Sequence, residues 1–213
     1  MNNKMMSKVF GWMFIGLMVS FITGYVVSLN PTMILNIFGK AWWILLIAEL
    51  GLVIFLSTRI AKMSPTTAKV SFLLYSFVSG LTFSSIFIVY EMSSIVFVFL
   101  ITALIFGIFA LIGYTTNLDL MKLRTYLFMG LLAIIICSII NIFIGSSGFN
   151  TMISIFAVVI FIGYTAYDIQ KVKRLYEDNA LPEDNLAIYG ALELYIDFIN
   201  LFIRLLNLLG KDN

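Results

Sequence analysis

Residues 185–210 read NLAIYGALELYIDFINLFIRLLNLLG, and this stretch decides the fold. It is almost wholly apolar, and its few polar residues recur at spacings of three and four. At about 100° per residue, this spacing brings the polar side chains to within about 40° of one direction on an α-helix. They are Tyr189, Glu193, Asp197, Asn200, Arg204 and Asn207. The helix is long enough to cross a bilayer, and its polar line must face protein or water, because hydrocarbon does not solvate ionisable groups.

The composition places the whole chain in a membrane. Of its 213 residues, 62% are hydrophobic and 11% are charged, whereas soluble domains carry about 25% charge. Six further apolar runs of spanning length precede the last one. The sequence therefore predicts an all-α integral membrane protein, a seven-transmembrane-helix bundle that forms a single domain over residues 1–213. The expected spans are residues 9–29, 41–58, 70–90, 93–114, 125–145, 150–167 and 186–209.

The connections between the spans are expected to be short, with two exceptions. One is the segment around Asn30 and Pro31, and the other runs from about Asp168 to Ala187. All three prolines of the chain lie between the apolar runs, where a missing amide hydrogen costs no helical bond.

The basic residues of the connections predict the orientation in the membrane, because cytoplasmic loops retain Lys and Arg. Only Lys40 and Lys211 fall on one side of the predicted bundle. The N-terminus is therefore expected in the cytoplasm and, after seven spans, the C-terminus outside, with the protein in the cell membrane. The residues that fall on the cytoplasmic side are Lys4, Lys8, Arg59, Lys62, Lys69, Lys122, Arg124, Lys171, Lys173 and Arg174.

The residue types that are missing exclude several kinds of chemistry. The chain has no histidine, which rules out His-ligated haem, the usual zinc sites and a Ser/His/Asp triad. Its one cysteine, Cys137, lies in an apolar run and is expected to be a buried thiol. The net charge of +2 is spread over the connections, which does not favour nucleic-acid binding. Because hydrolase motifs such as Gly-x-Ser-x-Gly are also missing, we expect neither an enzyme nor a tightly bound cofactor.

Acidic residues lie in the spans or at their ends. They are Glu49, Asp168, Glu193 and Asp197. An unpaired charge at the centre of a bilayer costs roughly 2.5 to 3.5 kcal/mol on insertion scales, so partners are expected. The available cations are Arg59 and Arg204. Helix geometry allows Asp168, Asp197 and Arg59 to converge at one depth, whereas Arg204 lies more than a turn further along its helix.

Two carboxyl groups within hydrogen-bond reach cannot both ionise cheaply, so they share a proton and titrate as a coupled pair. If Asp168 and Asp197 meet, they form a pH switch without histidine: a shared proton holds them together, and ionisation drives them apart unless a cation enters. Carboxylate oxygens are also the ligands that calcium prefers, so the same pair could bind calcium transiently. The alternative is a buried Asp-Arg-Asp cluster that only fixes helix packing, and the residues alone leave both interpretations open.

Small residues gather in the third span and permit close approach of a neighbouring helix, as membrane helices pack. This interpretation is favoured over a pore-lining role. The small residues are Ser76, Ser79, Gly80, Thr82, Ser84 and Ser85.

Three stretches together resemble the transmembrane BAX inhibitor motif family, in its bacterial YccA/YetJ-like branch. They are FVSGLTFS at residues 77–84, GYTAYDIQ at residues 163–170 and LYIDFINLFI at residues 194–203. The resemblance implies a central seventh helix surrounded by the other six. It also implies a pH-sensitive calcium leak, with Asp168 and Asp197 in the places of the family's sensor aspartates and Arg59 in the place of their basic latch partner.

The leading hypothesis is therefore a calcium-permeant leak channel or transporter gated by Asp168 and Asp197, with calcium and protons as its ligands. Candidates for the ion pathway are Glu49, Glu193, Asn200 and Arg204. The alternative is a regulatory binding partner of a membrane-bound protease, because YccA-like relatives resemble such modulators. In that case the contact is expected through the short N-terminal tail, Met1 to Lys8.

Overall fold

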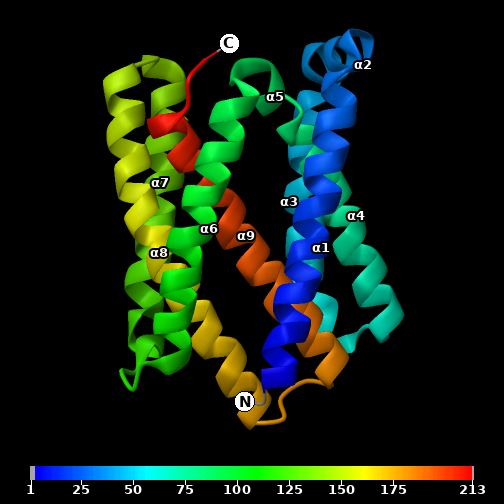
Figure 1. The fold of residues 1–213 in the computed structure, drawn as a ribbon, viewed down its shortest axis with the longest axis vertical. Helices are drawn as coiled ribbons and strands as arrows, with labels where there is room; N and C mark the ends of the chain where they lie inside the picture. The colour runs from blue at the N-terminus through cyan, green and yellow to red at the C-terminus, as the bar shows by residue number, and fades with distance from the viewer. Residues whose placement is uncertain (1–2, 213) are drawn as a thin grey trace. The chain divides into compact units, whose positions relative to one another are not determined.

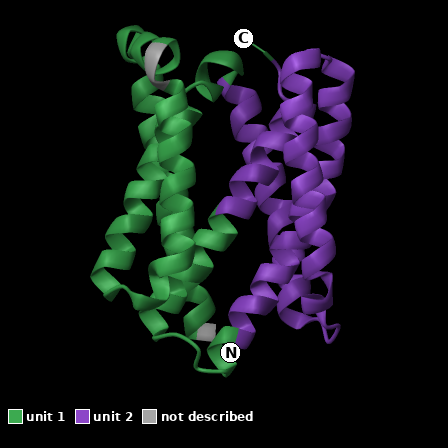
Figure 2. Cartoon of the chain, turned by 180° about the vertical axis from the view of Figure 1, so that it is seen from behind, with its two compact units in different colours: residues 1–91, 175–195, 212–213 green, residues 92–174, 196–211 purple. Residues whose placement is uncertain are grey.

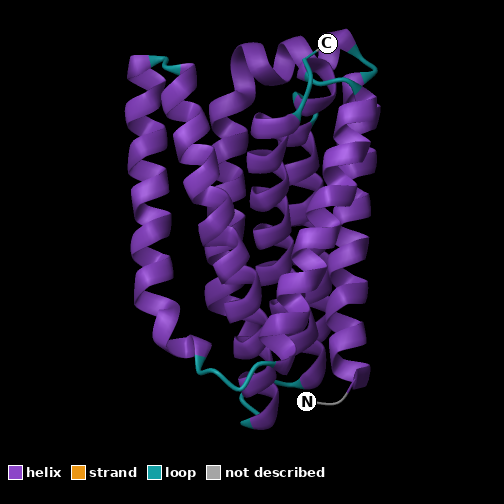
Figure 3. Cartoon of the chain, turned by 60° about the vertical axis from the view of Figure 1, so that its left-hand side comes forward, coloured by secondary structure: helices purple, strands orange, loops and turns teal. Residues whose placement is uncertain are grey.

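The structure is a computed structural model that describes residues 3–212, with the backbone alone described at residues 3, 40 and 41. Within this range the chain is helical throughout, apart from short loops and one isolated β-bridge between Tyr90 and Asp212 (Figure 3). Seven of the described helical segments are long and apolar enough to cross a membrane, which confirms the predicted fold class. They are Lys4–Ser28, Trp42–Lys62, Pro65–Val89, Met92–Thr115, Leu120–Ile144, Ser147–Glu177 and Glu183–Leu209.

The elements follow one another with few residues between them (Figure 1). The α-helices are α1 (Asn3–Ser28), α2 (Pro31–Asn36), α3 (Trp42–Arg59), α4 (Pro65–Phe83), α5 (Ile86–Val89), α6 (Met92–Thr115), α7 (Arg124–Ile144), α8 (Ser147–Glu177) and α9 (Glu183–Leu209). A π-helical segment, η1 (Ile37–Ala41), and two short 3₁₀ turns, η2 (Ile60–Lys62) and η3 (Leu120–Leu123), complete the set.

The prolines mark helix starts, as the sequence predicts. Pro31 and Pro65 open α2 and α4, where the helix needs no amide hydrogen from them. The preceding residues, Asn30 and Ser64, cap these helices by accepting hydrogen bonds from backbone amides of the first turn. Pro182 stands directly before α9.

Two predicted connections are wrong. The segment after Asn30 is not a loop, because α2 and η1 make residues 31–41 helical. The connection expected from about Asp168 to Ala187 is residues 178–182 alone, because α8 continues to Glu177 and α9 begins at Glu183. Asn179 closes α8 in a left-handed conformation (φ 49°), and the amide of Ala180 donates to the carbonyl oxygen of Leu175.

The chain divides into two compact units (Figure 2). Unit 1 comprises residues 1–91, 175–195 and 212–213, and unit 2 comprises residues 92–174 and 196–211. Helices α8 and α9 contribute to both units. Of the apolar stretch that makes each helix a candidate span, the share buried inside the protein is largest in α9, at 67%, as expected of a central seventh helix. The single domain predicted over residues 1–213 stays a prediction.

In unit 1, α1 packs closely along α4. Gly80 of α4 lies against the backbone of Ser20, where a Cβ atom would approach the carbonyl oxygen to 2.7 Å. Beyond the end of α4, the ring of Phe87 on α5 meets the ring of Phe21 on α1 edge-on, with centroids 5.2 Å apart. The small residues of the third span therefore allow close helix approach at Gly80, as predicted.

In unit 2, α6 and α7 both pack on α8. Gly113 of α6 lies against the backbone of Ala166, and Gly130 of α7 lies against the side chain of Ile160. The thiol of Cys137 is free and half-buried rather than buried, because it lines an apolar cavity of about 350 Å³ between α7 and α8. This unit holds both aspartates of the predicted sensor, Asp168 and Asp197.

Candidate functional site

Asp168 lies inside α8, and only 2% of the residue is exposed. Its Oδ1 atom lies 3.4 Å from Nζ of Lys171, one helical turn nearer the end of α8. The Lys171 side chain is 27% exposed, so its stem packs on the protein while its charge stays beside the carboxylate. Sequence reasoning used Lys171 only to predict orientation, although spacing i, i+3 on a helix is where oppositely charged side chains meet.

The polar end of α8 is held against the segment that follows α6. The side-chain amide of Gln170 donates to the carbonyl oxygen of Leu118 and accepts from the amide of Leu120, both at 2.8 Å. Arg174 forms an ion pair with Asp119 at 2.5 Å. Asp168 therefore belongs to a stretch of helix with tertiary contacts on it, and does not begin a loop.

Asp197 lies in α9 and is 4% exposed. Its neighbour Phe198 fixes this part of the helix against α6, since its ring meets the rings of Phe99 and Phe106 edge-on, with centroids 5.2 and 5.5 Å apart. Asp197 thus projects from a helix whose position in unit 2 is set by aromatic packing.

Two consecutive membrane-spanning helices therefore each contribute one buried carboxyl group to unit 2. Buried carboxyl groups can exchange protons, and a close pair can bind a hard cation. Among residues 3–212, no group of three or more His, Cys, Asp or Glu side chains could hold a metal ion.

The other predicted site residues are divided between the units. Arg59 ends α3 in unit 1 and is exposed, and its pairing with the aspartates stays a prediction. Glu193 is half-buried in the part of α9 that belongs to unit 1. In unit 2, the amide of Asn200 donates to the carbonyl oxygen of Ile196 at 2.8 Å. The guanidinium group of Arg204 reaches the hydroxyl group of Ser138 on α7 at 3.4 Å.

Glu49 has two hydroxyl partners that the sequence did not assign to it. Its Oε1 accepts a hydrogen bond from Ser79 at 2.6 Å, and its Oε2 accepts one from Thr82 at 3.1 Å. Both hydroxyl groups come from α4, and all three residues belong to unit 1. Ser79 and Thr82 therefore do more than permit helix packing, because they solvate a carboxylate inside the membrane-spanning part of the chain.

The sequence also matches known proteins over nearly its full length. A family model described as "Inhibitor of apoptosis-promoting Bax1", Bax1-I, matches residues 2–213. The chain belongs to the Bax1-I family. Relatives include a protein of Borreliella burgdorferi, 45% identical over 99% of this chain and 93% of its own length. Another is the inner membrane protein YbhL of Escherichia coli, 42% identical over 97% of this chain and 91% of its own length.

The Bax1-I match covers both units and all seven described spans. It therefore includes each of the three stretches on which the family resemblance rests, at residues 77–84, 163–170 and 194–203. This chain is accordingly a multi-pass membrane protein of the Bax1-I family, and a lipid bilayer is its environment.

Proposed function

We propose that this protein is a cation leak pathway, permeable to calcium and sensitive to pH, in which Asp168 and Asp197 form the gate. The observation that carries the proposal is the burial of both carboxyl groups, 2% and 4% exposed, within the same unit of a membrane protein. Ionisable groups kept inside a membrane protein are costly and are functional candidates for that reason. In this proposal the protein is not an enzyme and needs no tightly bound cofactor.

The depth of the two residues supports their pairing. Asp168 stands nine residues before the end of α8, and Asp197 stands fourteen residues after the start of α9. At 1.5 Å per residue, these positions lie about 14 and 21 Å from the connection between the helices. The difference is little more than one helical turn, which two side chains and a tilted helix can span.

The gate works through the coupled titration of the pair. One shared proton lets the carboxyl groups hold α8 and α9 together, whereas two ionised groups repel each other or admit a cation between them. Lys171 supplies a positive charge beside Asp168, and Arg59 is proposed as a further basic partner. The proposed pathway also includes Glu49, Glu193, Asn200 and Arg204, and the proposed orientation places the N-terminus in the cytoplasm and the C-terminus outside.

The test is calcium flux into dye-loaded proteoliposomes across about pH 5 to 8. We expect flux that depends on pH in the parent and loses this dependence in Asp168→Asn and in Asp197→Asn. Asp178→Asn is the matched control, because Asp178 is exposed in the connection after α8 and should leave the pH dependence unchanged.

Unchanged flux and pH dependence in Asp197→Asn would contradict the gating role. No flux in any folded variant would contradict the leak itself and favour a regulatory partner of a membrane protease. That alternative predicts that removal of residues 1–8 abolishes capture of the protease. Of this tail, residues 1 and 2 lie outside the described part, and Lys8 forms ion pairs with Glu183 and Asp184.

A further inference from the structure

Helices α7 and α8 lie side by side in unit 2 (Figure 1), and an apolar cavity of about 350 Å³ opens between them. Its inner wall includes Ile134 and Ile153, which are only 3% and 5% exposed. Its rim includes Met152 and Phe156, which are 67% and 47% exposed. The cavity therefore leads from the outer surface of the two helices into the core of the unit.

The sequence explains why the two helices leave this space. The α7 residues at its wall include Ala133 and Cys137, two short side chains that lie one helical turn apart on the same face. On one side of the cavity the helices touch, because a Cβ atom at Gly130 would overlap the end of the Ile160 side chain. On the other side they are joined by residues 145–146 alone. The helices are thus held at both ends of the cavity, and neither can tilt inward to close it.

The cavity lies at a depth that acyl chains occupy. Both α7 and α8 belong to helical segments long and apolar enough to cross a membrane. Cys137 stands seven residues before the last residue of α7, Ile144, which is about 10 Å along the helix. The hydrocarbon core of a bilayer is about 30 Å thick, so the cavity belongs to the leaflet on the side where α7 ends. At that depth, the medium in contact with the rim consists of acyl chains and contains no water.

The chemistry of the cavity favours an uncharged chain. Residues 125–167, which cover almost all of α7 and the first two thirds of α8, include no charged residue. An apolar cavity stays dry, and side chains beside a gap lose van der Waals contacts. A methylene group is about as large as a water molecule, which takes up roughly 30 Å³, so the cavity has room for about a dozen methylene groups. This is a large part of one acyl chain.

We propose that the cavity binds one acyl chain of a bilayer phospholipid, which enters past Met152 and Phe156 and reaches Ile134. Lipid chains are as apolar as the cavity wall, so the affinity comes from packing, because the chain supplies the contacts that the two helices cannot make with each other. The bound chain should exchange more slowly than lipids on an ordinary helix surface. This proposal does not depend on the calcium leak, since none of the residues proposed for the gate or the pathway lines the cavity.

The test is photo-crosslinking of the full chain in liposomes, with a small fraction of phospholipid that carries a diazirine in the middle of one acyl chain. Peptide mapping then locates the crosslinks. We expect a yield on residues 133–137 and 149–156 at least threefold higher than on Leu100 and Leu104. These two leucines of α6 are 62% and 66% exposed and do not line the cavity. Equal yields would indicate ordinary lipid contact only and would overturn the proposal.

Filling the cavity should remove the excess of crosslinks. Ala133→Phe places a ring in the cavity and should lower the yield there at least threefold. Ala103→Phe is the matched control, because Ala103 is exposed on α6 and this substitution should leave the yield unchanged. Cys137→Leu fills the cavity from the next turn of α7 and should act in the same direction as Ala133→Phe. An unchanged yield in both filling variants contradicts the proposal. If neither of them folds, the space for the added groups does not exist, and the proposal is wrong.

The kind of lipid is tested with the same label on different headgroups. Phosphatidylcholine and phosphatidylglycerol should give yields within twofold of each other, because residues 125–167 offer no charge to an anionic headgroup. A severalfold preference for phosphatidylglycerol would show that the headgroup selects the lipid and would contradict recognition of the chain. A labelled free fatty acid is the last comparison. If it crosslinks at the cavity and the labelled phospholipids do not, the occupant is a free fatty acid and the assignment to a bilayer phospholipid is wrong.

Discussion

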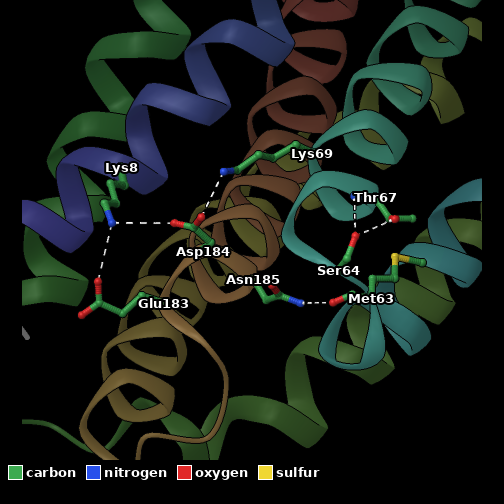
Figure 4. A network of polar contacts seen from close by, with 8 residues as sticks. All are labelled: Lys8, Met63, Ser64, Thr67, Lys69, Glu183, Asp184 and Asn185. Atoms are coloured by element: carbon green, nitrogen blue, oxygen red, sulfur yellow. Dashed lines mark hydrogen bonds and ion pairs between the residues drawn. The ribbon is translucent and has the colours of Figure 1, made fainter.

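The side-chain amide of Asn185 donates to the carbonyl oxygen of Met63 at 2.9 Å, and so joins the first turn of α9 to the end of η2 (Figure 4). The same nitrogen donates to the carbonyl oxygen of Ile60 at 2.6 Å. Asn185 is 1% exposed, and its partners are carbonyl groups at the end of η2, of which that of Ile60 also accepts from the amide of Met63 at 3.4 Å. The buried side chain of Asn185, which belongs to α9, thus caps the end of η2. The same contact orients the start of α9, the most buried span.

Replacing Asn185 should destabilise unit 1 strongly. Asn185→Ala removes the side-chain donor from both carbonyl groups and leaves the amide of Met63 as a donor to Ile60 alone, which should cost about 1–3 kcal/mol. Asn185→Asp should cost more, because it places a carboxylate against two carbonyl oxygens. Thermal unfolding in detergent, followed by circular dichroism, measures both. Asn117→Ala is the control, since Asn117 is exposed in the connection after α6. Equal melting temperatures for Asn185→Asp and the control would contradict the capping role.

The ion pairs around the start of α9 should contribute much less to the free energy of unfolding than Asn185 does. Asp184 pairs with Lys69 at 3.0 Å and with Lys8 at 3.8 Å (Figure 4). The Lys69 and Asp184 side chains are 32% and 44% exposed, and such pairs are typically worth 0.2 to 1 kcal/mol. A double-mutant cycle with Lys69→Ala and Asp184→Asn should give a coupling energy below about 1 kcal/mol that shrinks as salt is added. A coupling that does not respond to salt would show that the pair is shielded from solvent.

Replacement by alanine should lower the stability of the protein at Gly80 of α4 but not at Gly107 of α6. At Gly80, a Cβ atom would stand 2.7 Å from the Ser20 carbonyl oxygen and 2.7 Å from Cβ of Thr23, so α1 and α4 must move apart. Gly80→Ala should therefore cost about 1–3 kcal/mol. Gly107→Ala should be neutral or stabilising, because nothing lies within 4 Å of its Cβ position and alanine favours the helix. The melting temperatures of the two variants measure the difference, and equal values would contradict the close contact of α1 with α4.

The sequence predicts the spans well because their cause is local. A run of some twenty apolar residues forms a helix in a bilayer whatever its neighbours are, since its backbone must satisfy its own hydrogen bonds there. The last ten residues of α8 are different. They carry Lys171, Arg174 and Glu177, and their helix is held by contacts with residues 118–120 that lie about fifty positions earlier. A prediction from apolar runs detects only the part of a helix that hydrocarbon surrounds, so it places the end of this helix at residue 167.

The candidate site residues likewise include some that the sequence reveals and some that only the fold reveals. Asp168 and Asp197 can be singled out from the sequence, because an acidic residue in an apolar run is conspicuous and costly. The hydrogen-bond partners of Glu49 cannot be identified from the sequence, because Ser79 and Thr82 in an apolar helix are equally compatible with close packing and with a polar role. Which role they have depends on the face of α4 that meets α3, and that is a property of the fold.

The contact between α8 and the connection after α6 gives the last prediction. Gln170→Ala leaves the amide of Leu120 and the carbonyl group of Leu118 without partners, whereas Gln170→Glu keeps an acceptor for Leu120 but opposes the Leu118 carbonyl with a carboxylate. Hydrogen exchange at the Leu120 amide should therefore accelerate strongly in Gln170→Ala and less in Gln170→Glu. Lys122→Ala, at an exposed position of η3, is the control. If exchange at Leu120 is equally slow in all three variants, the Gln170 side chain does not protect that amide.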